Sequence, residues 1–254
     1  MRLVRSLLFV AYLYLMMALV GLIYLPGVLL TGRKAAAAAS HLWARLGVWG
    51  VRIICGVRHQ VRGLENVPKA GPVLIACKHQ AMWETLFFMT IFDEPAIVLK
   101  RELLALPIYG WYARIMEMIA VDREDGPSAI KELARQAEVA LGNGRPIIIF
   151  PEGTRQLPGA APDYKPGIAL LYRQLNIPCI PAALNSGLFW QAHGLMRSPG
   201  LITVEFLPPI APGLDRKTFM TELEERIESA SARLEAEAHS DTKVPKNRLN
   251  AVNA

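Results

Sequence analysis

The stretch PVLIACKHQAMWETLFF, residues 72–88, places an apolar run directly before a short polar turn and a second apolar segment. Residues 72–77 are typical of a buried β-strand, and residues 82–92 favour a helix. The polar side chains Lys78, His79 and Gln80 therefore fall on a strand-to-helix turn. In α/β proteins such turns lie at the carboxyl edge of the sheet, where ligands gather.

Short apolar runs alternate with longer periodic segments along the rest of the chain, and this pattern is typical of an α/β fold. Gly142-Asn143-Gly144 follows one periodic segment and is a suitable helix stop. We expect further strands at 96–100, 119–122, 146–150, 180–184 and 201–206. We expect further helices at 125–141, 167–175 and 217–238, the last of them packed on the surface.

The N-terminal segment is strongly apolar and has no charged residue from Ser6 to Leu30. A cleaved signal peptide has a shorter apolar core of about 7–15 residues, so we expect this segment to be retained. Pro26-Gly27 is expected to break or kink the helix near its end. A second apolar stretch, residues 35–57, carries Arg45 and Arg52. The two helices either form a hairpin in one leaflet of a membrane or include a span.

Charge is distributed unevenly along the chain, whose formal net charge is +6. Residues 1–64 contain eight Lys or Arg and no Asp or Glu. Beside an apolar helix, this charge favours a membrane surface with anionic lipids as the partner. No zinc-finger spacing or aromatic RNA-binding signature is present, so we expect no nucleic acid partner. Cys55, Cys77 and Cys179 lie in apolar runs and are expected to be buried, reduced thiols.

His79 and Glu84 form the first candidate pair. On a continuous helix, residues five apart are separated by about 140° around the axis and do not face each other. If His79 lies on the turn and Glu84 in the first helical turn, the carboxylate can accept the imidazole Nδ1–H. The second ring nitrogen is then a base for a hydroxyl or for water.

The second candidate stretch is FPEGTR, residues 150–155, which follows another predicted strand. The Arg155 guanidinium suits bidentate phosphate binding. Gly153 lets the backbone turn or approach a ligand closely. Glu152 is expected to contact substrate hydroxyls or to orient Arg155. Lys100 and Arg123 also follow predicted strands and are candidates for the same anion site.

Several other chemistries lack their motifs. There is no GxSxG elbow for a serine nucleophile and no GxxxxGK[ST] loop for binding a nucleoside triphosphate. The remaining histidines lack metal-ligand spacing, so we expect no metal.

The order of these blocks resembles the glycerolipid acyltransferase family. The blocks are His-x4-acid at 79–84, Asp122-Arg123, FPEGTR, and a Pro-x-x-Pro strand at 178–181. Within that family they are most similar to bacterial 1-acyl-sn-glycerol-3-phosphate acyltransferases, and the resemblance covers residues 63–206. One departure is Glu84, because the usual acid of the family is Asp. This departure puts the choice of acceptor lipid in doubt.

The resemblance implies an α/β acyltransferase domain with a mixed central sheet flanked by helices, preceded by a membrane-embedded helical pair. We expect domain boundaries at 1–57, 58–238 and a disordered tail at 239–254.

The resemblance also implies direct acyl transfer from acyl-CoA or acyl carrier protein, without another cofactor, to the sn-2 hydroxyl of 1-acyl-glycerol-3-phosphate. His79 would be the base and Glu84 its orienter. Arg123 and Arg155 would hold the phosphate with Lys100, while Glu152 and Gly153 would shape the glycerol site. The expected location is the inner membrane, with this domain facing the cytoplasm.

Three alternatives remain open on the sequence alone. The acceptor can be another lysophospholipid or a lyso-aminolipid. A membrane-anchored lipid hydrolase would use the same His79–Glu84 pair to activate water. A catalytically silent phospholipid-binding scaffold would consume no thioester.

Overall fold

The computed structural model describes residues 1–69, 71–122 and 126–240. A single seven-stranded sheet has the order β1-β7-β6-β2-β5-β3-β4. Strands β6, β2, β5, β3 and β4 run parallel, and β7 is antiparallel to β6 but parallel to β1. The strands are β1 (Val57–Arg62), β2 (Leu74–Cys77), β3 (Ala96–Lys100), β4 (Ile119–Val121), β5 (Ile147–Ile149), β6 (Cys179–Leu184) and β7 (Gly200–Phe206). The mixed sheet expected from the resemblance is confirmed.

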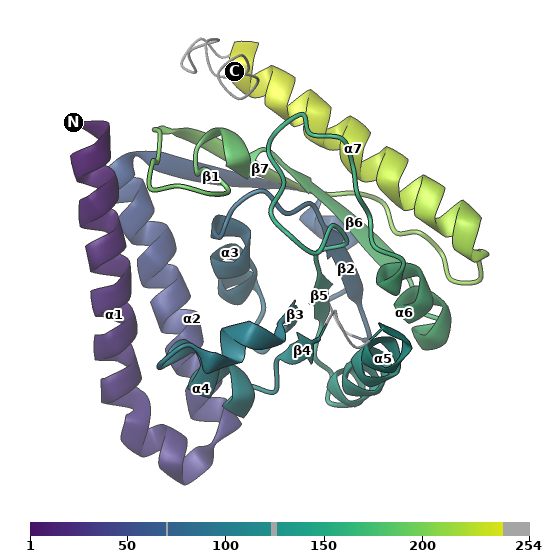
Figure 1. Ribbon diagram of the computed structural model, residues 1–254, viewed down its shortest axis with the longest axis horizontal. Coiled ribbons are helices and arrows are strands. Elements are labelled where there is room, and N and C mark those ends of the chain that lie inside the picture. Colours follow the sequence, from purple (N-terminus) through teal and green to yellow (C-terminus); the bar gives the residue numbers. More distant parts are fainter. Residues whose placement is uncertain (70, 123–125, 241–254) are drawn as a thin grey trace.

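Helices cover both faces of the sheet, as Figure 1 shows. They are α1 (Arg2–Thr31), α2 (Arg33–Gly50), α3 (Trp83–Ile91), α4 (Tyr109–Ile115), α5 (Gly126–Gly142), α6 (Gly167–Leu175) and α7 (Arg216–Ser240). Neighbouring residues of β2 point to opposite faces, as a strand requires. Ile75 belongs to the core shared with α1, α2, α3 and α4, whereas Leu74 belongs to the core shared with α5, α6 and α7.

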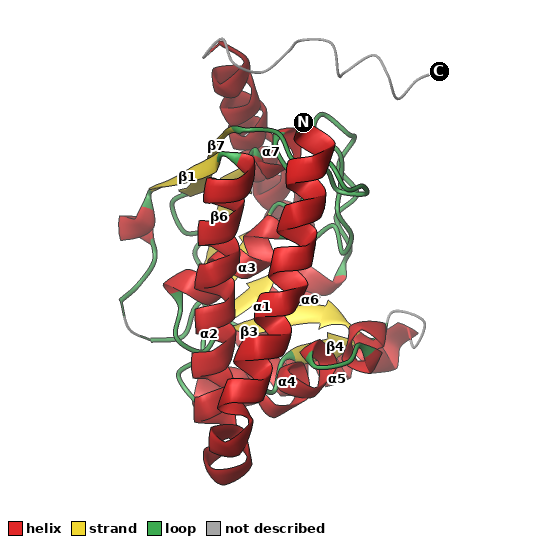
Figure 2. Ribbon diagram, turned by 90° about the vertical axis from the view of Figure 1, so that its left-hand side faces the viewer, coloured by secondary structure: helices red, strands yellow, loops and turns green. Residues whose placement is uncertain are grey.

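The α1–α2 pair forms an antiparallel hairpin beside the sheet domain (Figures 1 and 2). The helix does not break at Pro26-Gly27, because α1 continues through Pro26 to Thr31. The chain reverses at Gly32, whose φ of +61° suits a residue without a Cβ. Proline removes one helix hydrogen bond, and we infer that packing of α1 on α2 outweighs this loss.

Most predicted elements are present with ends shifted by one or two residues, but β1 and α4 were not predicted. Strand β1 pairs with β7, which is far away in the sequence, so its partner is not visible locally. The three cysteines are buried and unpaired, as expected. Helix α7 reaches Ser240, two residues beyond its predicted end, and residues 241–254 of the expected tail lie outside the described residues.

Candidate active site

The turn between β2 and α3 brings His79 and Glu84 together as expected. Nδ1 of His79 lies 3.0 Å from Oε1 of Glu84. A carboxylate only accepts hydrogen bonds, so this contact places the ring proton on Nδ1 and leaves Nε2 as the basic nitrogen. The imidazole also stacks on Phe150 with ring centroids 4.1 Å apart. The side chain of His79 keeps 16% of its surface exposed, which leaves it accessible to a substrate.

Glu84 accepts hydrogen bonds from several groups besides His79. Its side chain is fully buried. Oε1 also accepts the backbone N–H groups of Gln80 and Ala81, both at 2.6 Å. Oε2 accepts the hydroxyl of Ser186 at 2.9 Å. Because Glu84 lies in the first turn of α3, its longer side chain can reach back over the turn, and the helix N-terminus favours its charge.

Glu152 lies beneath the turn rather than facing open space. Its side chain is fully buried, and Oε1 lies 2.7 Å from Nζ of Lys78. Oε2 accepts the backbone N–H of His79 at 2.9 Å. Burial raises the pKa of the Glu152 carboxyl, although the charge of Lys78 opposes the shift. The structure thus shows contacts of Glu152 with Lys78 and with the backbone of His79, and a contact of Glu152 with substrate hydroxyls stays a prediction.

The rest of FPEGTR turns tightly at the end of β5. Gly153 has a φ of +70°, a conformation that favours glycine, and its N–H donates to the carbonyl of Phe150. Arg155 is half-buried and forms no ion pair with any residue described here. The next residue, Gln156, donates its N–H to the carbonyl of His79 at 2.8 Å. The two candidate stretches are therefore in direct contact.

Of the two remaining predicted cations, Lys100 and Arg123, only Lys100 is among the described residues. Lys100 is exposed at the carboxyl end of β3, the same edge of the sheet as His79. Two strand spacings separate β3 from β2, a distance of about 10 Å. Arg123 lies outside the described residues. The structure therefore places Lys100 on the predicted edge and does not test a complete phosphate clamp.

Several supporting residues were missed by the sequence reasoning. Lys78 is 2% exposed and lies between Glu152 and Glu228 of α7. Tyr164 donates its hydroxyl to Glu228 at 2.9 Å. A lysine at the end of an otherwise apolar strand was the only sequence signal for this cluster. Its partners come from distant segments and could not be identified from spacing.

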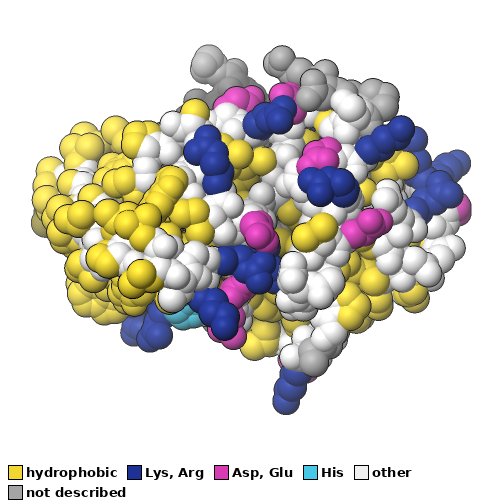
Figure 3. Space-filling view, turned by 90° about the horizontal axis from the view of Figure 1, so that it is seen from below, with side chains coloured by type: hydrophobic (Ala, Val, Ile, Leu, Met, Phe, Trp, Pro, Cys, Tyr) yellow, Lys and Arg dark blue, Asp and Glu magenta, His cyan; other side chains and the backbone are white. Residues whose placement is uncertain are grey.

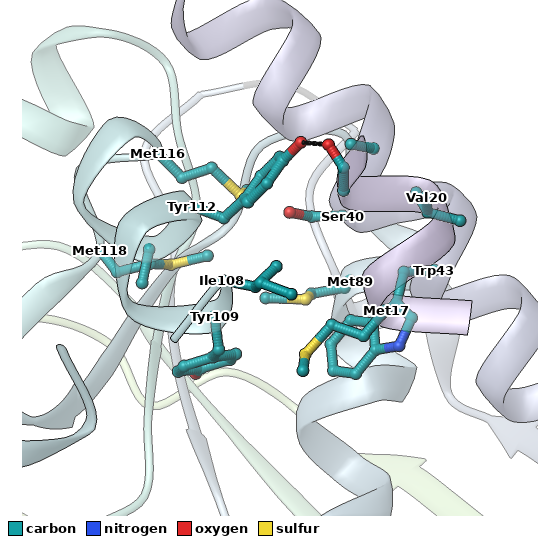
Figure 4. Close-up of a pocket in the computed structure, with 13 residues that line it drawn as sticks. Met17, Val20, Ser40, Trp43, Met89, Ile108, Tyr109, Tyr112, Met116 and Met118 are labelled. Atoms are coloured by element: carbon teal, nitrogen blue, oxygen red, sulfur yellow. Dashed lines mark hydrogen bonds between the residues drawn. The ribbon is translucent and has the colours of Figure 1, made fainter. Parts of the chain in front are cut away.

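An apolar pocket lies between the α1–α2 pair and α4 (Figure 4). Tyr112 closes one side and donates its hydroxyl to the carbonyl of Gly21 at 2.8 Å. The labelled side chains around the pocket are mostly apolar: Met17, Val20, Trp43, Met89, Ile108, Met116 and Met118. The lining of the pocket is thus mostly apolar and contains no charged residue.

A histidine that is hydrogen-bonded to a buried carboxylate, at the edge of this mixed sheet, is an arrangement that can activate a hydroxyl group or water. The acyltransferase family model matches residues 58–185. The chain is 37% identical to the 1-acyl-sn-glycerol-3-phosphate acyltransferase of Pseudomonas aeruginosa over 74% of this chain and 72% of that protein. The chain belongs to the acyltransferase family.

The chain is also similar to a mammalian protein and to a solved structure. The 1-acyl-sn-glycerol-3-phosphate acyltransferase alpha of Mus musculus is 28% identical over 66% of this chain and 60% of its own length. The crystal structure of the 1-acyl-sn-glycerophosphate acyltransferase of Thermotoga maritima has a TM-score of 0.75, with 22% identity. It covers 93% of this chain and 98% of that one, and at this identity it supports the fold alone.

Proposed function

We propose that the protein transfers a fatty acyl group from a thioester to the sn-2 hydroxyl of 1-acyl-glycerol-3-phosphate, which gives phosphatidic acid. The observation that carries the proposal is the 3.0 Å contact between His79 Nδ1 and buried Glu84, beside the FPEGTR turn. The names of the relatives support this acceptor. The donor is either acyl-CoA or acyl carrier protein, and we propose no other cofactor.

The chemistry follows from the free nitrogen of His79. Nε2 takes the proton of the acceptor hydroxyl while the oxygen attacks the thioester carbonyl carbon. The carbon–sulfur bond then breaks, and the thiolate receives the proton from the imidazolium. Glu84 stabilises the transient imidazolium through Nδ1–H. No acyl-enzyme forms, because the acceptor oxygen itself attacks the donor.

Binding of the substrates is assigned to two regions. Arg155, Arg123 and Lys100 hold the acceptor phosphate, since such a dianion needs clustered cations close to the base. Gly153 allows the glycerol to approach the backbone closely. The apolar pocket beside Tyr112 takes an acyl chain, because its lining provides dispersion contacts along an unbranched hydrocarbon.

We further propose that the α1–α2 pair anchors the protein in one leaflet of the inner membrane, with the sheet domain facing the cytoplasm. By length and composition, α1 is the one helix among the described residues that could cross a membrane. It is tied to the sheet domain at both ends, however. Ser6 accepts the N–H of Arg197, and Arg33 at the start of α2 pairs with Glu94 at 3.0 Å.

Phe9, Leu13, Val20 and Val28 of α1 are buried between these two ends, so the pair presents only its outer face to lipid. Large apolar side chains are exposed on that face from Leu3 to Leu30. Figure 3 shows the corresponding gathering of hydrophobic side chains on the left, where α1 and α2 lie.

The proposal is tested by thiol release and product analysis with the full-length protein in mixed micelles. We expect conversion of 1-acyl-glycerol-3-phosphate and acyl-CoA or acyl carrier protein to phosphatidic acid. His79→Ala removes the base, so the rate should fall by about a hundredfold to ten-thousandfold while vesicle binding is unchanged. Turnover like that of the wild type in this variant would contradict the assigned base.

The same assay separates the alternatives. A panel of lysophospholipids and lyso-aminolipids identifies a different acceptor if one of them is used faster. Free fatty acid released without any acceptor would indicate a hydrolase. If neither thioester is consumed, the protein is a binding scaffold and the proposal is wrong.

A further inference from the structure

In the turn that carries His79, side-chain carboxylates accept most of the backbone N–H groups, while the carbonyl of His79 accepts the N–H of Gln156. Lys78 donates its N–H to the carbonyl of Ala182, but the next three backbone N–H groups all donate to side-chain carboxylates. His79 donates to Glu152, and Gln80 and Ala81 donate to Glu84. The position of the imidazole therefore depends on where these carboxylates are held.

Glu152 is held by Lys78, and Lys78 is held in turn by helix α7. Nζ of Lys78 lies 2.7 Å from Oε1 of Glu152 and 2.7 and 2.9 Å from the two oxygens of Glu228. Burial alone would lower the pKa of Lys78, but the charges and hydrogen bonds of both carboxylates outweigh it and raise the pKa. Lys78 thus remains charged and connects Glu152, in the turn after β5, to Glu228 of α7.

A second contact links the same helix face to the same turn. Gln80 donates its side-chain N–H to Glu235 at 2.7 Å, and its side-chain oxygen accepts the N–H of Gly187. Glu228 and Glu235 are seven residues apart, which places them on one stripe of α7 about 10 Å from each other. Figure 1 shows α7 running alongside β6, next to the strand that ends at the turn.

We propose that Lys78 and Glu228 are positioning residues, and that α7 holds the catalytic turn through them in the geometry needed for proton transfer. The matched family region ends at residue 185, so α7 lies beyond it. The inference rests on the proposed function for its kinetic readout and on backbone contacts for its second readout. Proton transfer is sensitive to displacements of less than 1 Å, so a loosened turn lowers the rate without weakening substrate binding.

The kinetic experiment compares Lys78→Met, Lys78→Arg and Glu228→Gln with the wild type in the full-length protein. We expect kcat to fall at least about tenfold in Lys78→Met and Glu228→Gln, with the KM of acceptor and donor within about twofold of the wild type. Lys78→Arg keeps the charge and should restore part of kcat. The matched control is Glu237→Gln on the same helix, because Glu237 pairs with Arg62 and Arg233 at the surface. The kcat and KM of Glu237→Gln should equal those of the wild type.

The second experiment measures amide hydrogen exchange of the peptide that spans residues 78–84 and does not depend on activity. We expect faster exchange in Glu228→Gln and no change in Glu237→Gln. Glu228 is 26% exposed, so this variant decides the question even if Lys78→Met does not fold. Unchanged exchange in Glu228→Gln, or a rise in KM with unchanged kcat, would overturn the inference. If the wild-type protein showed no acyl transfer in the activity assay, that result would instead overturn the proposed function.

Discussion

At the scale of single residues, the length of the Glu84 side chain matters because its carboxylate serves several donors at once. Oε1 receives His79 and two backbone N–H groups, while Oε2 receives Ser186. The glutamate that stands in place of the usual aspartate therefore reaches all of these hydrogen-bond donors. A shorter acid at this position would have to give up some of these contacts.

We accordingly expect Glu84→Asp to lower kcat by about tenfold to a hundredfold, equivalent to about 1.4–2.8 kcal/mol of transition-state stabilisation. The retracted carboxylate cannot reach both His79 and Ser186. A double-mutant cycle with Ser186→Ala checks the cause, since both changes act on the same carboxylate and their effects should be less than additive. Full additivity, or an unchanged kcat in Glu84→Asp, would show that this contact set has no part in catalysis.

At the scale of elements, α7 combines an apolar stripe with acidic residues that reach into the domain. Phe219, Leu223 and Ile227 are fully buried, as in an ordinary packed helix. Glu235 is half-buried beside Gln80, and burial raises the pKa of its carboxyl above the ordinary 4.5. Gln80, Lys78 and His239 oppose this shift, and Glu228 adds to it.

The raised pKa predicts how stability depends on pH. Between 4.5 and the folded-state pKa, the folded protein binds more protons at Glu235 than the unfolded chain does. The free energy of unfolding therefore falls as pH rises through this window. Glu235→Gln should match the wild type below pH 4.5 and be more stable at pH 7, as measured by thermal unfolding in detergent.

Glu237 lies on the same helix, and its pKa is shifted in the opposite direction, so it serves as a control. Hydrogen bonds from Arg62 lower the pKa of Glu237, so its contribution is present at neutral pH and is lost as pH falls. Glu237→Gln should therefore be slightly less stable than the wild type at pH 7, by a small amount because the pair is exposed. A loss of stability in Glu235→Gln at pH 7 would contradict the assignment of Glu235.

At the scale of the whole molecule, one side carries the exposed apolar face of α1 and α2 and the other carries the charged sheet domain (Figure 3). The apolar pocket lies between the α1–α2 pair and α4. The proposed membrane anchor places this apolar face in contact with lipid.

Membrane binding should therefore depend on the outer face of α1. Leu22 and Ile23 are 67% and 71% exposed. We expect Leu22→Gln and Ile23→Gln each to weaken binding to anionic vesicles by about tenfold to a hundredfold, because each removes about 1.5–3 kcal/mol of apolar burial in lipid. Sedimentation with vesicles measures the effect. Val139→Gln, at an exposed apolar position of α5, should bind as the wild type. Equal binding of all variants would show that this face does not enter the lipid.

The sequence by itself determined most strands and helices and the pairing of His79 with Glu84. Apolar periodicity is a local property, and five residues across one strand-to-helix turn allow little choice of geometry. The tertiary structure decided what lies beneath that turn. Lys78 meets Glu228 across 150 residues, and Ser186 meets Glu84 across 102. The pairing of β1 with β7 and the contacts of Glu152 with Lys78 and His79 were decided in the same way. These contacts depend on how distant elements pack and pair in register, and no local pattern specifies that.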